Sequence, residues 1–199
     1  TKLDSLPSSV LSTLGKYTCA LAVNPADPNI IFVGGLQNYR TTDGGLHWSY
    51  ASAATHHVDQ HVLVYGSGGS ILYNGNDGGI MVTTNNGDSW LNQNTNLAIT
   101  QFYNGISLEK TMPSLMYGGT QDNGSVKRIS GTTWHMIAQG DGGATLSDSN
   151  SVYVEAQFGS KMRSSNFGAS FTNINSGIAE GGEYVTPLAM NPMNPKSIY

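Results

Sequence analysis

A short pattern that returns several times along the chain limits the fold more than any other feature of this sequence. It reads RTTDGGLHW over residues 40–48, VTTNNGDSW over residues 82–90 and RSSNFGASF over residues 163–171. A shortened copy, KRISGTTW, ends at Trp134. Each full copy has a hydroxyl residue, one spacer, Asp or Asn, one spacer, Gly, two further residues and an aromatic ring. We call this pattern the box.

The residue types of the box predict a tight turn followed by re-entry into a strand. Asp and Asn side chains bond the backbone two residues further on and tolerate left-handed geometry. Gly adopts a positive φ without steric cost, and the aromatic residue is expected to bury a large ring. The box residues are Thr41, Asp43, Gly45 and Trp48 in the first copy, Thr83, Asn85, Gly87 and Trp90 in the second, and Ser164, Asn166, Gly168 and Phe171 in the third.

The spacing of the boxes predicts the fold class. The box aromatics recur at intervals of about 40 residues, which is the length of a propeller blade. Between them lie short runs rich in Val, Ile, Tyr and Thr and bounded by Gly and Asn, as expected for strands. The sequence therefore predicts an all-β chain: a β-propeller of four-stranded antiparallel blades, with about four and a half blades that belong to a larger ring.

The same alignment predicts how the chain is divided. We expect residues 1–199 to form a single propeller segment. It comprises a blade remnant at 1–15, blades at about 16–55, 56–97, 98–139 and 140–178, and the start of a fifth at 179–199. Residues 1–7 look like those that follow a box aromatic, and residues 197–199 look like the middle of a strand. Both ends are therefore expected inside blades, with the remaining blades supplied by the same parent or by other chains.

Composition narrows the classes of function. Charged residues make up only 11% and the formal net charge is −4, whereas nucleic-acid binding requires a basic face. Cys19 is the one cysteine, which rules out an internal disulfide and thiolate metal sites; its apolar neighbours predict a small core residue. No run reaches the roughly 18 apolar residues of a membrane span. Few charges and many small polar residues suit a secreted or cell-surface β protein.

Blade topology indicates where function should be sought. In an up-and-down blade, the start of the first strand and the loop between strands two and three share one face, which we call the rim; the box turns lie on the other. In the rim stretch THHVDQH, the residues His57, Asp59 and His61 alternate and are expected on one side of a strand. They could hold a divalent metal ion, and a hydrogen-bonded polar cluster is the alternative. No other cofactor is expected.

Carboxylates gather on the same predicted face. Asp77, Asp122, Asp141, Glu180 and Glu183 are expected to ring it, with Asp59 nearby and Glu155 on a strand. Glycosidic cleavage needs two such groups across a cleft, so Asp59, Asp77, Asp122 and Asp141 are the catalytic candidates. Asp-Gly and Asn-Gly are also ordinary turn sequences, which is the structural alternative. The predicted binding rim consists of His57, His61, Asn76, Gln121, Asn123, Gln157, Glu180, Glu183, Tyr103 and Tyr184.

The boxes resemble the Asp-box, or BNR repeat, of sialidases, xyloglucanase-type glycoside hydrolases and sortilin-type propellers. The ordered set HVDQHVLV, NDGGIMVTTNNGDSW, QFY, YGGTQDNG, GDGG and VYVEAQFG is similar to that of large secreted bacterial BNR propeller proteins, described as sortilin-like or glycosyl-hydrolase-like. The resemblance covers about residues 16–199. It implies a bacterial extracellular or cell-surface propeller, often one module of a very large protein.

Two functions follow as expectations. The favoured one is a module that binds a glycan or an extracellular protein, or that packs into an extracellular assembly. The alternative is an endo-acting, xyloglucanase-like glycoside hydrolase that uses rim carboxylates, with Tyr103 and Tyr184 as stacking surfaces.

Sialidase activity is disfavoured, because it needs three clustered arginines. Arg40, Arg128 and Arg163 all precede a box or its remnant at equivalent positions, which predicts a structural role. The tyrosines Tyr73, Tyr117 and Tyr153 are expected in the core.

Overall fold

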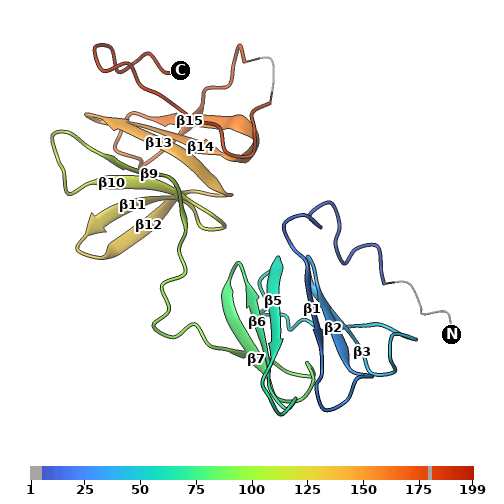
Figure 1. Cartoon of the computed structure of the whole chain (residues 1–199). Coiled ribbons are helices and arrows are strands. Elements are labelled where there is room, and N and C mark those ends of the chain that lie inside the picture. Colours follow the sequence, from blue (N-terminus) through green and yellow to red (C-terminus); the bar gives the residue numbers. More distant parts are fainter. Residues whose placement is uncertain (1–5, 179–180) are drawn as a thin grey trace. The chain divides into compact units, whose positions relative to one another are not determined.

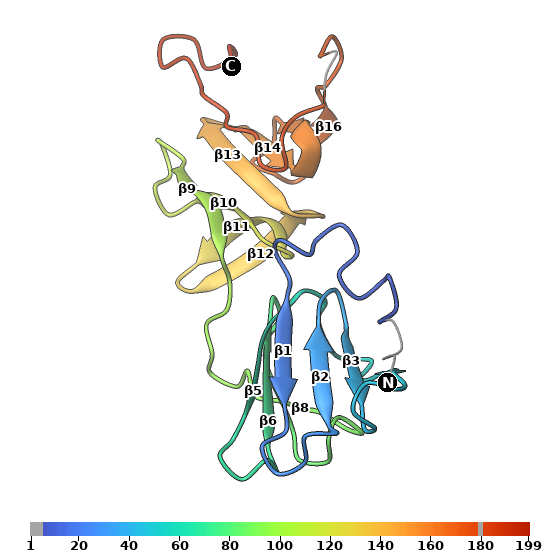
Figure 2. The ribbon, with the colours of Figure 1, turned by 45° about the vertical axis from the view of Figure 1, so that its right-hand side comes forward.

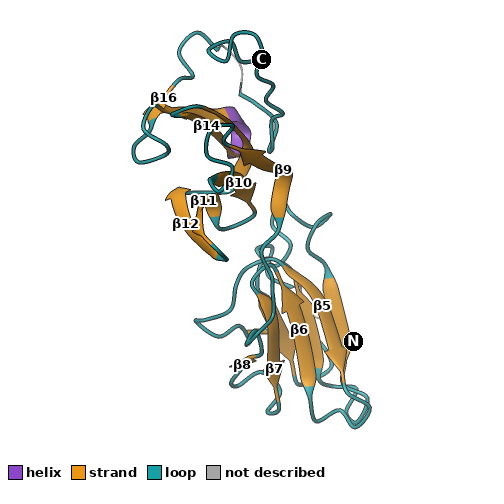
Figure 3. Ribbon diagram, turned by 90° about the vertical axis from the view of Figure 1, so that its left-hand side faces the viewer, coloured by secondary structure: helices purple, strands orange, loops and turns teal. Residues whose placement is uncertain are grey.

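The computed structural model describes residues 6–178 and 181–199, so the predicted rim residue Glu180 lies outside the described residues (Figure 1). The chain divides into two compact units, residues 1–99 and residues 100–199. Each unit contains two antiparallel sheets of four strands, in which every strand pairs with the next one along the chain. These sheets are the blades of a β-propeller, as the sequence predicts. A single 3-10 turn, Gln157–Gly159, interrupts the β structure of the described residues (Figure 3).

The first unit holds blades 1 and 2 (Figure 2). Blade 1 consists of β1 (Ala20–Val23), β2 (Ile31–Gly34), β3 (Asn38–Thr41) and β4 (Ser49–Tyr50). Blade 2 consists of β5 (Gln60–Tyr65), β6 (Leu72–Asn76), β7 (Gly79–Thr83) and β8 (Leu91–Asn92).

The second unit holds blades 3 and 4. Blade 3 consists of β9 (Phe102–Leu108), β10 (Met116–Thr120), β11 (Gly124–Ser130) and β12 (Thr133–Ala138). Blade 4 consists of β13 (Gly142–Asp148), β14 (Ser151–Ala156), β15 (Ser160–Ser164) and β16 (Thr172–Asn173). Beyond it, Met190 and Ile198 form an isolated antiparallel bridge.

The turn of each box is built by short-range hydrogen bonds. In blade 2 the Thr83 hydroxyl donates to Asn85 Oδ1 at 2.9 Å and accepts the N–H of Gly87 at 2.9 Å. Asn85 Oδ1 also accepts the N–H of Ser89 at 3.0 Å. The boxes of blades 1 and 4 repeat this pattern from Thr41 and Ser164. We call these three segments, which lie between the third and fourth strands, the box turns.

Box aromatics contribute to the packing of neighbouring blades within a unit. Trp90 of blade 2 is buried, donates from Nε1 to Ala51 O at 2.8 Å and meets the ring of Phe32 edge-on at 6.2 Å. Phe171 of blade 4 packs against a cluster that includes Tyr117 of blade 3. We expected every box aromatic to be buried, but Trp48, Trp134 and Phe171 are only half-buried.

Two further expectations from the sequence, on Cys19 and Tyr73, are wrong. Cys19 is exposed, because the buried positions of its stretch are its neighbours Thr18 and Ala20. Tyr73 is 45% exposed, whereas Tyr117 and Tyr153 are buried as expected.

The arginine pattern also differs from the predicted one. Arg40 and Arg163 lie opposite Phe32 and Tyr153, but the equivalent residue opposite Tyr117 in blade 3 is Lys127. Arg128 instead bonds carbonyl groups of its own blade, Gly131 O at 2.6 Å and Ser114 O at 3.3 Å. A one-residue shift in the shortened box therefore gives Arg128 a different role.

Candidate functional site

The rim of the second unit brings together four predicted site residues around one carboxylate. Asp141 lies just before β13, and both of its carboxylate oxygens accept hydrogen bonds. Oδ2 accepts the hydroxyl of Tyr184, and Oδ1 accepts the N–H of Asp122 at 2.6 Å. The N–H of Asp141 donates to Gln157 Oε1 at 2.9 Å, and the N–H of Gln157 donates to Asp141 O at 3.1 Å. Asp141 is therefore the centre of a network that joins three loops.

The phenol of Tyr184 is held in its protonated form by this network. Its pKa is raised far above the ordinary tyrosine value, first by partial burial and then by its hydrogen bond to Asp141. The negative charges of Asp141 and Asp122 and the neighbouring Tyr103 raise this pKa further. Tyr103, Asp122 and Asp141 thus all act electrostatically on Tyr184, as residues of a single site do.

Phe158 stands beside this cluster and was not predicted as a site residue. It is 65% exposed, and its backbone is left-handed with φ 62°. Its ring centroid lies 5.3 Å from that of Tyr184, with the two rings nearly perpendicular. A backbone bond from Phe158 N–H to Tyr184 O at 3.2 Å joins the two segments. The loop sequence AQFG offered one signal, an aromatic residue in the loop between strands two and three.

The carboxylate of Glu155 supports the site from beneath. Sequence reasoning associated this residue with the rim carboxylates, but it is fully buried. Oε2 accepts the N–H of Ala144 at 3.2 Å and Oε1 accepts the N–H of Thr186 at 3.1 Å. Any side chain at Gly143 would collide with this carboxylate, since a Cβ there would lie 1.5 Å from Oε2. Glu155 therefore anchors the segment that carries Tyr184 and is not available to a ligand.

The rim of the first unit carries a smaller cluster around Asp77. The side chain of Asp77 is 7% exposed and bonds Nε2 of His61 on β5. The hydroxyl of Tyr17 donates to Asp77 Oδ2 at 3.1 Å, and its ring meets the His61 ring edge-on at 4.8 Å. Tyr17 was not among the predicted site residues. The carboxylate is enclosed by donors from two blades, which favours a structural role.

The predicted alternation of His57, Asp59 and His61 is wrong. β5 begins at Gln60, and Asp59 before it is left-handed with φ 65°, so only His61 belongs to the strand. The left-handed residue breaks the two-residue period on which the prediction depended. Within residues 6–178 and 181–199 there is no group of three or more His, Cys, Asp or Glu side chains that could hold a metal ion.

The remaining predicted rim residues have local roles or lie at the surface. Asn76 Oδ1 accepts the N–H of Gly78 at 2.9 Å and closes the loop between β6 and β7. The Asn123 amide donates to Gln121 O at 3.0 Å. Glu183 is exposed, and its carbonyl accepts the hydroxyl of Thr186.

Among the described residues, no helix is long and apolar enough to cross a membrane.

Comparison with known proteins finds similarity to solved structures. The chain matches no protein-family model and no curated protein. A GH74 enzyme from Niastella koreensis is 21% identical, with a TM-score of 0.38, and the match covers 84% of this chain and 31% of that one. A GH74 xyloglucanase from Xanthomonas campestris is 16% identical, with a TM-score of 0.40, covering 89% and 34%. YCF48 bound to D1 peptide is 15% identical, with a TM-score of 0.38, covering 91% and 58%. The chain thus spans about a third of the length of these two glycoside hydrolases, and the likenesses extend to the fold alone.

Proposed function

We propose that this chain is an extracellular propeller module of the Asp-box type whose rim, in residues 100–199, binds a hydroxyl-rich ligand, a glycan in the first place. The observation that carries the proposal is the exposed ring of Phe158 beside the network of Asp122, Asp141 and Tyr184.

The backbone conformation of Phe158 supports the proposal that its exposed ring binds a ligand. A left-handed conformation costs a non-glycine residue about 1–2 kcal/mol, and such strained residues cluster at ligand sites. Exposing a large apolar ring gives up burial as well. Here the ring is held outward by two backbone hydrogen bonds, Phe158 N–H to Tyr184 O and Gly182 N–H to Phe158 O. The fold thus stabilises an aromatic surface that contributes little to the core.

The polar groups beside the ring match the chemistry of a sugar. A pyranose presents an apolar face, which stacks on aromatic rings, and an edge of hydroxyl groups, which need acceptors and donors. Asp122 is exposed next to Asp141, and the protonated Tyr184 lies between Asp141 and Phe158. An apolar ring flanked by carboxylate oxygens supplies both kinds of contact within one small area.

Binding to a panel of plant, algal and bacterial polysaccharides, measured by calorimetry and affinity electrophoresis, tests this proposal. We expect the variant Phe158→Ala to lose at least about tenfold in affinity, because alanine removes the stacking surface. Tyr50→Ala is the matched control, since Tyr50 is 56% exposed but belongs to blade 1. Equal affinities in the two variants would contradict the assignment. If no glycan bound but a protein ligand bound through Phe158, the site would stand and its ligand would be a protein.

An endo-acting glycoside hydrolase is the second candidate, and the proximity of Asp122 and Asp141 favours it. The binding function ranks first because both oxygens of Asp141 already accept hydrogen bonds, whereas glycosidic cleavage needs two carboxyl groups that act on the substrate. Release of reducing ends from the same polysaccharides distinguishes the two functions. Turnover that disappears in Asp122→Asn or Asp141→Asn but persists in Asp88→Asn would establish the enzyme. Binding without release would support the module.

A further inference from the structure

The box turns hold one peptide group in a clamp that is formed from two directions. The residue after the box Asp or Asn is left-handed in every copy: Gly44 at φ 71°, Asn86 at φ 54° and Phe167 at φ 57°. This geometry points its N–H and its carbonyl to opposite sides of the turn. The contacts of these two groups recur from blade to blade.

The N–H group bonds the first turn of its own blade. Gly44 N–H donates to Asn29 O at 3.0 Å, and Phe167 N–H donates to Asn150 O at 3.0 Å. Asn29 and Asn150 end the turns between the first and second strands of blades 1 and 4. One half of the clamp is therefore internal to a blade.

The carbonyl bonds a cation of the preceding blade. Arg40 of blade 1 donates to Asn86 O in blade 2 and also pairs with Asp88. Lys127 of blade 3 donates to Phe167 O in blade 4 at 2.8 Å, and the Tyr117 hydroxyl reaches the same oxygen at 3.3 Å. The other half of the clamp therefore fastens the box turns of blades 2 and 4 to the preceding blade of the same unit.

Blade 4 also has the cation and the aromatic residue that form the donor half of the clamp, the half that bonds the carbonyl of the next box turn. Arg163 lies opposite Tyr153 in the sheet, as Lys127 lies opposite Tyr117. Its guanidinium is 5.7 Å from the Tyr153 ring, and the Lys127 ammonium is 6.0 Å from the Tyr117 ring. The hydrogen bond that the guanidinium makes runs to Ser151 Oγ of its own blade, at 3.2 Å.

The acceptor half is the turn whose carbonyl accepts the N–H of the box turn. Residues 191–196 supply it, because they reproduce the turn between the first and second strands of blade 1. Asn191 N–H donates to Ser197 O at 3.0 Å, as Asn24 N–H donates to Ile30 O at 2.9 Å. The Asn191 side chain accepts the N–H of Met193 at 2.9 Å, as Asn24 does from Ala26 at 2.8 Å.

The register of this second hairpin is fixed by its backbone bonds. Ala189 and Tyr199 exchange two hydrogen bonds of 2.8 Å, in the register of Ala22 and Phe32. Counting along the two turns from their asparagines, Lys196 occupies the position of Asn29, and Tyr199 that of Phe32.

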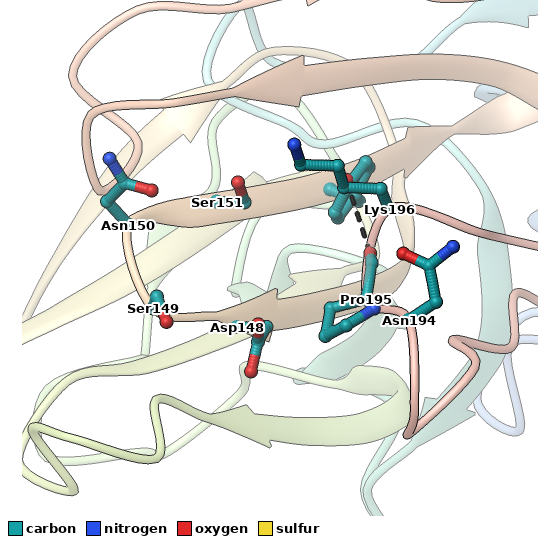
Figure 4. A pocket seen from close by; sticks show the side chains of 8 residues that line it. Asp148, Ser149, Asn150, Ser151, Asn194, Pro195 and Lys196 are labelled. Atoms are coloured by element: carbon teal, nitrogen blue, oxygen red, sulfur yellow. Dashed lines mark hydrogen bonds between the residues drawn. The ribbon is translucent and has the colours of Figure 1, made fainter.

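A cavity of about 360 Å³ is lined by Tyr153, the sheet partner of Arg163, on one side and by residues 194–196 on the other. Figure 4 shows it between the turn of blade 4 at Asp148–Ser151 and the segment Asn194–Lys196. The Tyr153 hydroxyl donates to Pro195 O at 3.4 Å. In blade 2 the corresponding space beside Phe32 is filled by Gly87, and in blade 4 that beside Tyr117 is approached by Gly168.

We propose that this place receives the box turn of a fifth blade, whose inner hairpin is residues 189–199. The left-handed peptide of that turn donates its N–H to Lys196 O and accepts a hydrogen bond from Arg163. Continuity with the contacts in blades 2 and 4 identifies the occupant: there, a cation that lies opposite an aromatic residue donates to the left-handed peptide of the next box turn.

Thermal unfolding of an extended chain tests the proposal. A copy of residues 33–52 is appended after Tyr199, because Tyr199 holds the position of Phe32. We expect the unfolding midpoint to rise by about 5 °C, and the appended box turn to resist proteolysis. Arg163→Met should remove most of this rise, while Arg128→Met, whose arginine bonds its own blade, should leave it intact. Arg163→Lys should also keep it, as Lys127 does in blade 3.

Three results would overturn the proposal. The first is an extended chain that melts at the midpoint of the original one. The second is an equal effect of Arg163→Met and Arg128→Met on the rise. The third is a dimer of the original chain, seen by light scattering, that Arg163→Met dissociates, because the box turn of a second copy would then occupy the cavity. Circular dichroism of the unextended Arg163→Met variant verifies that its own blades are folded.

Discussion

The box turns and the rim cluster of residues 100–199 use similar side chains in opposite ways. In a box turn, the hydroxyl, amide and backbone groups bond within two to four residues of one another. In the rim cluster, the bonds that meet at Asp141 join residues 16, 19 and 43 positions apart. The box turn is therefore a local folding device that can be repeated, whereas the rim cluster exists only after the blades have packed. Changes in box turns should alter stability, and changes at the rim should alter binding.

The largest effect is expected at a box glycine. Gly87 has φ 81°, and a Cβ there would lie 2.9 Å from two atoms of the Phe32 ring. Gly87→Ala combines backbone strain with overpacking and should lower the free energy of unfolding by about 3 kcal/mol. Gly177→Ala is the control, since its φ is 87° but a Cβ there would meet nothing within 4 Å. Urea denaturation of both variants checks the difference, and equal losses would show that the ring contact contributes nothing.

A box hydroxyl should have the next largest effect. Thr83 is buried, and its hydroxyl accepts the N–H groups of Asn85 and Gly87. Thr83→Val keeps the shape but leaves these donors without their acceptor, which should cost about 2 kcal/mol in urea denaturation. Thr84→Val changes the exposed spacer next to it and should stay within about 0.5 kcal/mol of the original chain. Similar losses in both would refute the network as the source of stability.

The sequence predicts the boxes and the strands because both depend on short-range patterns. The turn chemistry of Thr83, Asn85 and Gly87 is contained within five consecutive residues of one segment. Strand identity likewise follows from β-branched runs between glycines, and the fold class follows from the period of the boxes. The fourth strands of blades 1, 2 and 4 are nonetheless only two residues long, because the box turn occupies much of the hairpin.

The candidate site could be predicted only in part, for a physical reason. Topology places Asp122, Asp141 and Tyr184 on one face, and the structure brings them into contact. The sequence could not reveal that Phe158 has a left-handed backbone and an exposed ring, because phenylalanine rarely adopts that conformation. The position of Asp59 was mispredicted for the same reason, because its positive φ ends the alternation of side chains along the strand.

The acid sensitivity of the first box sharpens the comparison among box turns. A backbone hydrogen bond from His47, the Thr41 hydroxyl and the His47 ring hold the pKa of Asp43 well below its usual range. Because the pKa is lower in the folded chain, ionised Asp43 stabilises the fold at pH values above the unfolded pKa near 3.8. This stabilisation is lost as the pH falls through the folded pKa. Asp43→Asn, which copies Asn85 and Asn166, should therefore flatten the decline in urea midpoint below about pH 4. An unchanged decline in the variant would assign the acid sensitivity to other carboxylates.

The smallest effect on stability is expected from Tyr184→Phe, and it sharpens the rim side of the comparison. Tyr184 is 45% exposed, so losing its hydroxyl should cost no more than about 0.5 kcal/mol. Its raised pKa means that the phenol stabilises the fold below the unfolded value of 10.0 and ceases to do so as pH rises through the folded value. Difference absorbance between the original chain and the Tyr184→Phe variant should therefore show one phenolate that forms only above the ordinary tyrosine range.

Asp141→Asn should shift this late titration toward the ordinary tyrosine range, because it removes the charge that the Tyr184 hydroxyl faces. Asp88→Asn, which changes a carboxylate of the second box turn, should not. If Tyr184 titrated in the ordinary tyrosine range in the original chain, the hydrogen bond to Asp141 would not persist in solution. The rim would then lack the fixed donor that distinguishes it from an ordinary turn.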